Sequence, residues 1–412
     1  MRTKNKVVIC CVLAILGMII LILPSNCVAE EIMANSWTDM NPSTKPSARS
    51  GHAMAYDSES DRSILFGGYS GSYEGDTWAY DYNTNTWTLV KASGPGTPPI
   101  RSQHTMAYDT ESDRVILFGG QYEGTPLGDT WAYDYNINTW TIMNPLTAPS
   151  PTTNHAMVYD SESDRVIIFG GPSAETWVYN YNSNIWTKKT PASSPNPRSD
   201  HAMAYDSESD RVIMFGRDGG GSFDTWAYDY NMDAWTNLNP MTGPSSRSQH
   251  AMAYDSESDR VVLFGGSGLT DDTWTYDFNA NIWVNKNPSA KPSPRIDFAM
   301  SYDSESDRII LFGGLATLKN DETWSYELSP PDVPFIPSLF IVVPSMVLMA
   351  FISFHIMRPS ILRLRHSPCM RTPPPNDAPV HHQSLPLNKS GSEHAQEHPI
   401  LFNVWVQSVE FW

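Results

Sequence analysis

The chain has 412 residues, of which 12% are aromatic and 17% are charged, and its formal net charge is −18 at pH 7. Most of this negative charge belongs to residues 30–332, which carry 41 acidic and 19 basic side chains. So acidic a surface repels the phosphate backbone of nucleic acids, which argues against DNA or RNA as a partner.

The N-terminal segment has the layout of a secretory signal. Basic residues within 1–6 precede an unbroken apolar run at 7–23, and small residues follow the run up to Ala29. This order is typical of signal peptides, so residues 1–29 are predicted to be one. The apolar run is also long enough for an uncleaved signal anchor, and in both cases the basic N-terminus is expected to stay inside the cell.

Residues 30–332 are organised by a repeat of about fifty residues. Each unit contains an alternating segment, an acidic hexapeptide, an apolar run, a variable segment and a Thr-Trp pair, and the first five units continue with an asparagine- or aspartate-bearing turn and a second tryptophan. Successive units begin at intervals of 52, 51, 46, 49 and 48 residues, at His52, His104, His155, His201, His250 and Phe298. These patterns predict four short antiparallel strands in each unit, and such a unit is typical of one blade of a β-propeller.

Two residue patterns recur at fixed places in the repeat. Its first mark is a glycine doublet after the second strand, present in five units: Gly67 and Gly68, Gly119 and Gly120, Gly170 and Gly171, Gly265 and Gly266, Gly313 and Gly314. Its second mark is a third-strand tryptophan, present in all six: Trp78, Trp131, Trp177, Trp226, Trp274 and Trp324. The fourth unit has Gly216-Arg217 in place of the doublet, so we expect a distorted exit from its second strand. With these marks the repeat resembles the kelch family, and in particular the central domain of galactose oxidase. The resemblance implies an all-β, six-bladed kelch-type β-propeller.

The sixth unit lacks a fourth strand of its own. The segment SWTDMNP at 36–42 matches TWTIMNP at 139–145, which is a fourth strand followed by its connection. We therefore expect the strand of Trp37 to complete the sixth blade, because an open ring would expose unpaired strand edges. The recurring tryptophans are predicted to pack between blades rather than to stack on a ligand.

The acidic hexapeptide DSESDR occurs five times, and once more as DTESDR. In the first copy Asp57, Glu59 and Asp61 place carboxylates at alternate positions, which makes them weak candidates for calcium. The hexapeptide lacks the sharp-turn glycine and distant glutamate of an EF-hand, and Arg62 offers an internal counter-ion. We interpret it as a solvated hairpin turn, and we predict neither a metal site nor a cofactor. The recurring histidines are likewise assigned to structural hydrogen bonding, because the sixth unit has phenylalanine at that position.

Variation among the units is concentrated between the second and third strands, where a rigid scaffold usually carries its recognition residues. The side chains of contact-forming type in these segments are Tyr69, Tyr73, Tyr122, Arg217, Phe223 and Lys319. We expect a non-catalytic module that binds an extracellular protein or glycan through this face. One alternative is an architectural or adhesive surface protein.

The other alternative is a carbohydrate-active enzyme of galactose-oxidase-like or sialidase-like type. Residues 30–332 contain no cysteine for the oxidase's Tyr-Cys copper site. No unit has the Asp-box spacing expected of a sialidase, and SYEGDTW at 72–78 is only a faint likeness. We therefore predict that the protein is not an enzyme, because function has to be argued from a site.

The C-terminal region is predicted to anchor the chain. Residues 335–357 contain no Asp, Glu, Lys or Arg and are long enough to span a bilayer as one helix. Arginines follow immediately, which marks that side as cytoplasmic. Residues 358–412 form a basic and then Pro-rich tail, predicted to be disordered. The expected location is the cell membrane, with a single span, the propeller outside and the tail inside.

Overall fold

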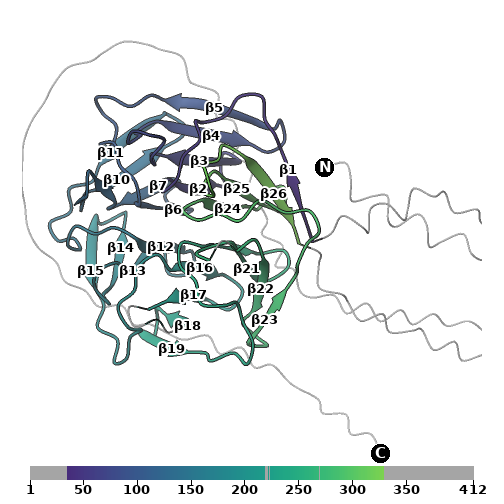
Figure 1. The fold of residues 1–412 in the computed structure, drawn as a ribbon. Coiled ribbons are helices and arrows are strands. Elements are labelled where there is room, and N and C mark those ends of the chain that lie inside the picture. The colour runs from purple at the N-terminus through teal and green to yellow at the C-terminus, as the bar shows by residue number, and fades with distance from the viewer. Residues whose placement is uncertain (1–34, 219–220, 222, 269, 329–412) are drawn as a thin grey trace, which may run out of the picture. The chain divides into compact units, whose positions relative to one another are not determined.

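The computed structural model describes residues 35–218, 221, 223–268 and 270–328. In Figure 1 these residues form six four-stranded antiparallel sheets, arranged as blades around a common axis. Among the described residues there is no helix, and hence none that could cross a membrane. The predicted signal segment 1–29, the predicted span 335–357 and the tail lie outside the described residues.

Each blade runs from an inner first strand to an outer fourth strand (Figure 1). Blade one contains β2 (Ala53–Asp57), β3 (Arg62–Phe66), β4 (Thr77–Asp81) and β5 (Thr86–Lys91). Blade two contains β6 (Thr105–Asp109), β7 (Arg114–Phe118), β10 (Thr130–Asp134) and β11 (Thr139–Ile142), with a small extra hairpin of β8 (Gln121–Tyr122) and β9 (Thr125–Pro126). Blade three contains β12 (His155–Asp160), β13 (Arg165–Gly170), β14 (Thr176–Asn180) and β15 (Ile185–Lys188).

The remaining blades repeat this plan. Blade four contains β16 (Ala202–Asp206), β17 (Arg211–Arg217), β18 (Phe223–Asp229) and β19 (Ala234–Asn237). Blade five contains β20 (Ala251–Asp255), β21 (Arg260–Phe264), β22 (Thr273–Asp277) and β23 (Ile282–Asn285). Blade six contains β24 (Ala299–Asp303), β25 (Arg308–Phe312), β26 (Thr323–Glu327) and β1 (Ser36–Asp39).

The ring is closed by its first strand, as predicted. β1 pairs antiparallel with β26, so that Trp37 lies opposite Tyr326 and Thr38 lies opposite Ser325. In Figure 1 the purple strand β1 accordingly lies beside the green strand β26. Trp37 is 1% exposed, and its indole N–H donates to the Thr273 hydroxyl of blade five at 2.9 Å. The first and last strands of the described residues thus share one blade, and all six blades have four strands.

The fourth-strand tryptophans join each blade to the preceding one. Every one of them is buried and donates its indole N–H, at 2.9–3.0 Å, to the threonine of the Thr-Trp pair in the third strand of the preceding blade. The six pairs are Trp37 to Thr273, Trp87 to Thr323, Trp140 to Thr77, Trp186 to Thr130, Trp235 to Thr176 and Trp283 to Thr225. The third-strand tryptophans differ: apart from Trp131 they are only half-buried and border these core clusters. The prediction of tryptophan packing between blades holds fully for the fourth-strand column alone.

The glycine doublet lets the chain pass beneath the connection to the next blade. Gly67 and Gly68 have φ values of +67° and +99°, and a Cβ on Gly67 would lie 2.8 Å from the Arg101 carbonyl oxygen. Only glycine adopts this conformation in so narrow a space without strain. In blade four the expected distortion is absent, because β17 and β18 continue their pairing out to Arg217 opposite Phe223. The departure from the doublet therefore lengthens that hairpin.

Candidate functional site

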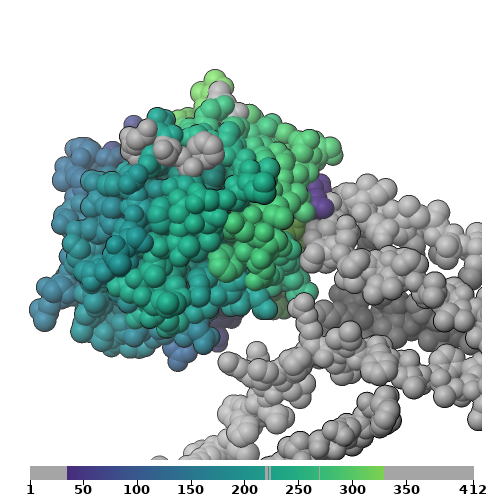
Figure 2. All heavy atoms as spheres, turned by 90° about the horizontal axis from the view of Figure 1, so that it is seen from below, coloured from purple at the N-terminus to yellow at the C-terminus, as the bar shows by residue number. Residues whose placement is uncertain are grey.

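The propeller has two distinct faces. We call the face with the six hexapeptides the turn face, and the face with the segments between second and third strands the loop face. Figure 2 shows the propeller from its side, with green loop atoms of blade six projecting at the upper rim. Because each blade repeats the same strand order, residues at equivalent positions form rings around the axis. A candidate site is therefore either a ring of equivalent residues or a place where one blade differs from the others.

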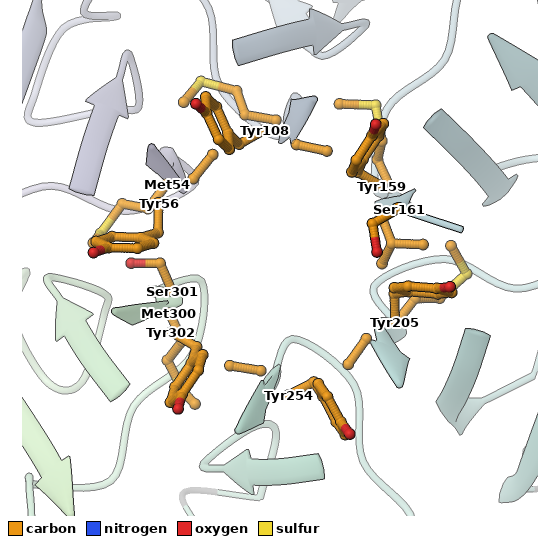
Figure 3. A pocket seen from close by; sticks show the side chains of 18 of the residues that line it. Met54, Tyr56, Tyr108, Tyr159, Ser161, Tyr205, Tyr254, Met300, Ser301 and Tyr302 are labelled. Carbon is orange, nitrogen blue, oxygen red and sulfur yellow. The ribbon is translucent and has the colours of Figure 1, made fainter. Parts of the chain in front are cut away.

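A funnel of about 340 Å³ opens along the axis on the turn face, lined by methionine, alanine and tyrosine side chains of the first strands. Figure 3 shows its ring of six tyrosines: Tyr56, Tyr108, Tyr159, Tyr205, Tyr254 and Tyr302. The Tyr56 hydroxyl donates to Asp61 at 2.9 Å and accepts the Glu305 amide N–H of blade six at 3.4 Å. Burial, and next the charge of Asp303, raises the pKa of Tyr56. The Tyr56 hydroxyl therefore stays protonated and links blade one to blade six.

The hexapeptide forms the turn that we inferred from its composition. Asp57 accepts the backbone N–H groups of Glu59 at 3.1 Å and Ser60 at 3.0 Å, which closes the turn between β2 and β3. Asp61 has a φ of +55°, and Arg62 pairs with the third-strand residue Asp81 at 2.8 Å. Asp57, Asp61 and Arg62 thus each have a local structural role, whereas Ser58 and Glu59 are exposed.

The three calcium candidates do not converge on one point. The Asp57 carboxylate faces backbone amides, whereas Asp61 accepts from Tyr56 and from Asn83 at 2.9 Å. Glu59 is exposed to solvent. Within the described ranges no group of three His, Cys, Asp or Glu side chains is arranged to hold a metal ion.

The recurring histidines are buried rings packed against the preceding blade. His52 lies edge-on to Phe312 at 5.5 Å between ring centroids, and its Nε2 donates to the Phe312 carbonyl at 3.1 Å. Phe298 occupies the same position in blade six, with its ring 5.7 Å from that of Phe264. Burial, assisted by the charge of Arg49, lowers the pKa of His52 to about 3. This position requires an aromatic ring, and the histidines fill it in their neutral form.

Replacing His201 with phenylalanine is expected to make the protein more acid-resistant. Burial lowers the pKa of His201 well below its ordinary value, so the unfolded chain binds a proton below about pH 6.5 that the folded protein does not. Stability contributed by this neutral ring is present above that pH and is lost as the pH falls. Between pH 7 and pH 5 the variant should lose about 2 kcal/mol less than the wild type in urea unfolding.

His250→Phe provides the control for this experiment. It removes a titrating ring in the same way, and it also removes the 3.1 Å hydrogen bond from His250 to the Phe215 carbonyl. Neither ring nitrogen of His201 has a hydrogen-bond partner in the part of the chain that the structure describes. At pH 7 the His250 variant should therefore be less stable than the His201 variant, by about 1 kcal/mol. An unchanged pH dependence in both variants would contradict the assignment.

A circle of six backbone hydrogen bonds joins the blade connections around the propeller axis on the loop face. One residue of each blade connection adopts a left-handed conformation and donates its N–H to the carbonyl of its counterpart in the preceding blade, at 2.7–3.3 Å. The six residues are Gly51, Gln103, Asn154, Asp200, Gln249 and Asp297. Burial, followed by the charge of Asp297, raises the pKa of Asp200 to about 6. The circle positions the loops around it.

Four of the predicted contact residues come together on this face. Tyr73 lies between Tyr69 and Tyr122, with ring centroids 5.2 Å away in each case and edge-to-face geometry. The Lys319 ammonium group lies 4.4 Å from the centre of the Tyr69 ring. Tyr69 and Tyr122 are each 38% exposed. We call these four side chains, contributed by blades one, two and six, the aromatic cluster.

The other two predicted contact residues lie apart, in blade four. Arg217 and Phe223 are opposite each other where β17 and β18 end, and the Arg217 side chain is exposed. The Phe223 side chain is outside the described part of the structure. No contact joins Arg217 to the aromatic cluster among the described residues. The six residues thus form two separate groups on the loop face.

Sequence reasoning missed a set of buried arginines just before the histidines. Arg49 is 1% exposed, and its guanidinium donates to the Gly67 carbonyl at 3.0 Å and to Asp76 at 2.7 Å. The same arrangement recurs at Arg101, Arg198, Arg247 and Arg295. Two recurrences in the sequence could have indicated this pairing. An arginine lies three residues before the buried histidine or Phe298 in five units, and an acidic residue precedes each Thr-Trp pair.

Comparison with known proteins agrees with this geometry. Residues 25–216 and 165–330 match the family described as KLHDC2/KLHL20/DRC7 Kelch-repeats domain. Kelch domain-containing protein 2 of Bos taurus is 32% identical over 31% of this chain and 30% of its own length. The N-(sulfonatooxy)prop-2-enimidothioate sulfolyase of Thlaspi arvense is 30% identical over 31% of this chain and 36% of its own. The Host cell factor homolog hcf-1 of Caenorhabditis elegans is 28% identical over 33% of this chain and 20% of its own. The matches span about a fifth to a third of these relatives.

Proposed function

Because the chain belongs to the kelch-repeat domain family, we propose that its propeller is a non-catalytic interaction module whose aromatic cluster contacts a partner protein. Kelch propellers generally bind proteins, and the cluster has the composition of an interface centre. Tyrosine is enriched among the residues that dominate binding energies, because it combines a large rigid ring with a polar end. The mutual packing of Tyr69, Tyr73 and Tyr122 is the observation that carries the proposal.

The packing of these rings reduces the entropic cost of binding. Tyr73 is held between two neighbours, and the Lys319 ammonium covers one face of Tyr69. Side chains that are already ordered lose little rotamer freedom when a partner docks. The cluster is also rooted in the backbone, since Tyr69 bridges to both Ser50 and Tyr73.

The polar groups of the propeller support a binding role over a catalytic one. In the funnel, the Tyr56 hydroxyl is occupied by Asp61 and by the amide of Glu305. The neutral histidines pack on phenylalanines, and the buried arginines are paired with carboxylates. Catalysis needs a nucleophile, acid or base free to meet a substrate, and these groups are committed to structure.

We further propose that the module is displayed outside the cell on a single membrane span. The support is the sequence pattern of 1–29 and of 335–357 with its following arginines. An extracellular protein is then the partner class, while a surface glycan and self-association are the competing outcomes of the experiment below.

The experiment screens the full chain against arrays of purified surface proteins and of glycans, and then compares two variants on each hit. Replacing Tyr69, Tyr73 and Tyr122 together with serine should weaken binding to a protein hit at least about tenfold. The control replaces Ile137 and Met232, which are 69% and 75% exposed on the turn face, with serine. It should leave affinity unchanged. The proposal fails if the control weakens binding and the tyrosine variant does not.

A further inference from the structure

Blade three departs from the ring of buried arginines. The residue three positions before the buried histidine, or before Phe298 in blade six, is arginine in five blades, but in blade three it is Thr152, three before His155. Thr152 is 7% exposed, and its hydroxyl has no hydrogen-bond partner among the described residues. A buried polar atom without a partner is costly, so a ligand that donates to this hydroxyl would be favoured here.

Blade three nevertheless has the residues whose equivalents in the other blades accept hydrogen bonds from the buried arginine. In blade one the Arg49 guanidinium donates to the Ser47 carbonyl and hydroxyl at 3.1 and 2.9 Å, to the Gly67 carbonyl at 3.0 Å, and to Asp76. The equivalent positions in blade three, counted from the same histidine, doublet and Thr-Trp pair, are Ser150, Gly170 and Glu175.

These three residues line a cavity of about 140 Å³ together with Thr152, Ile168 and Trp177. The cavity thus lies where the other blades bury their guanidinium groups. Exposed residues such as Ser150, Pro172 and Ser173 form part of its lining, so it is accessible from the surface. No side chain of the described chain has replaced the missing arginine within it.

The Glu175 carboxylate has the orientation of the carboxylates that pair with the buried arginines in the other blades. Its Oε2 accepts the Trp177 indole N–H at 3.0 Å, just as Asp76 accepts that of Trp78 at 2.7 Å. Glutamate is compatible with the arrangement, because Glu322 pairs with Arg295 in blade six. Lys188 contacts the other oxygen, Oε1, at 2.5 Å from the exposed side. An exposed lysine on a flexible stem exchanges readily with another cation.

We propose that the blade-three pocket formed by Ser150, Thr152, Gly170 and Glu175 binds the guanidinium group of an arginine side chain of a partner protein. The guanidinium group presents five N–H donors in a plane, which matches a carboxylate and carbonyl acceptors spread around one site. An ammonium group is a compact point charge without this fork, so lysine fits the pocket less well. The Thr152 hydroxyl supplies one more acceptor.

This inference goes beyond the proposed function, and it uses none of the residues of the aromatic cluster. The serine variant of Tyr69, Tyr73 and Tyr122 should therefore bind arginine as the wild type does. Failure of one proposal is in this way separable from failure of the other.

The test is calorimetric titration of the full chain with N-acetyl-arginine amide and, separately, with its lysine counterpart. The arginine compound should show saturable binding to one site, at least tenfold tighter than the lysine compound. Thr152→Arg should abolish this binding by filling the pocket from within, and should raise Tm by at least about 2 °C. Thr187→Arg adds the same charge at an exposed position of blade three and should keep the binding.

Glu175→Gln guards against a folding defect, because it removes the charge without changing the size of the side chain. It should weaken arginine binding at least tenfold while Tm stays near the wild-type value. The proposal is overturned if the wild type shows no saturable binding at millimolar arginine compound. It is equally overturned if a folded Thr152→Arg or Glu175→Gln variant binds as tightly as the wild type.

Discussion

Replacing Trp37 with alanine is expected to cost about 3–5 kcal/mol of stability, the usual range for a large buried aromatic residue. The indole packs against the rings of Phe264 and Tyr326, at 5.0 and 4.9 Å between centroids, and donates to the Thr273 hydroxyl. The variant therefore leaves a cavity between two blades and a buried hydroxyl without its donor. Urea unfolding of the full chain measures the loss.

The consequence of this substitution is larger than its local contacts suggest, because Trp37 belongs to the strand that closes the ring. Weakening β1 exposes the edge of β26 and the apolar face of blade five. Thr38→Ala is the matched control, since Thr38 is exposed on the same strand, and it should change stability by no more than about 0.5 kcal/mol. A loss below about 1 kcal/mol for the Trp37 variant would contradict its role in closure.

Replacing Arg101 with leucine is expected to cost about 3–5 kcal/mol, because it leaves a charged partner without its counter-ion. Arg101 is fully buried and contacts Asp129 through two N–H groups, both at 2.7 Å. It also donates to the Gly119 carbonyl at 2.9 Å, which ties the glycine doublet to the blade connection. Thermal and urea unfolding of the single variant measure the loss.

The double variant Arg101→Leu, Asp129→Leu separates the charge from the rest of the contact. Because it removes both members of the pair, it should be more stable than Arg101→Leu alone. If the double variant loses, relative to the wild type, the full sum of the Arg101→Leu and Asp129→Leu single effects, the two groups do not interact. The ring of arginines would then be only a space-filling feature.

The propeller fold was predictable because the sequence contains six copies of the same repeat. The displaced copy SWTDMNP at 36–42 was enough to place Trp37 beside the last blade, since a repeat array with one strand missing at one end and one extra at the other can close only that way. The hexapeptide was also readable, because the side chains of a turn bond to backbone groups two or three residues away.

The features that escaped prediction depend on contacts between distant segments. Arg49 and Asp76 are separated by two strands, so their pairing could not be predicted from a single copy of the repeat. Thr152 stands out only once that pairing is known. The types of the residues at Tyr69, Tyr73 and Tyr122 were evident, but their contact depends on how two blades pack. In blade four, Arg217 was read as an interruption, although it extends the pairing of β17 with β18.

The most direct test of the closed ring is a disulfide between β1 and β26. In a chain whose four native cysteines are replaced with serine, Thr38→Cys and Ser325→Cys place thiols on paired residues of adjacent strands. Mass spectrometry after mild oxidation should find this crosslink within one chain. Combining Thr38→Cys with Ser301→Cys, which lies two strands further along the same row, should give none. A crosslink in the second pair, or none in the first, would contradict the closure of the propeller by its N-terminal strand.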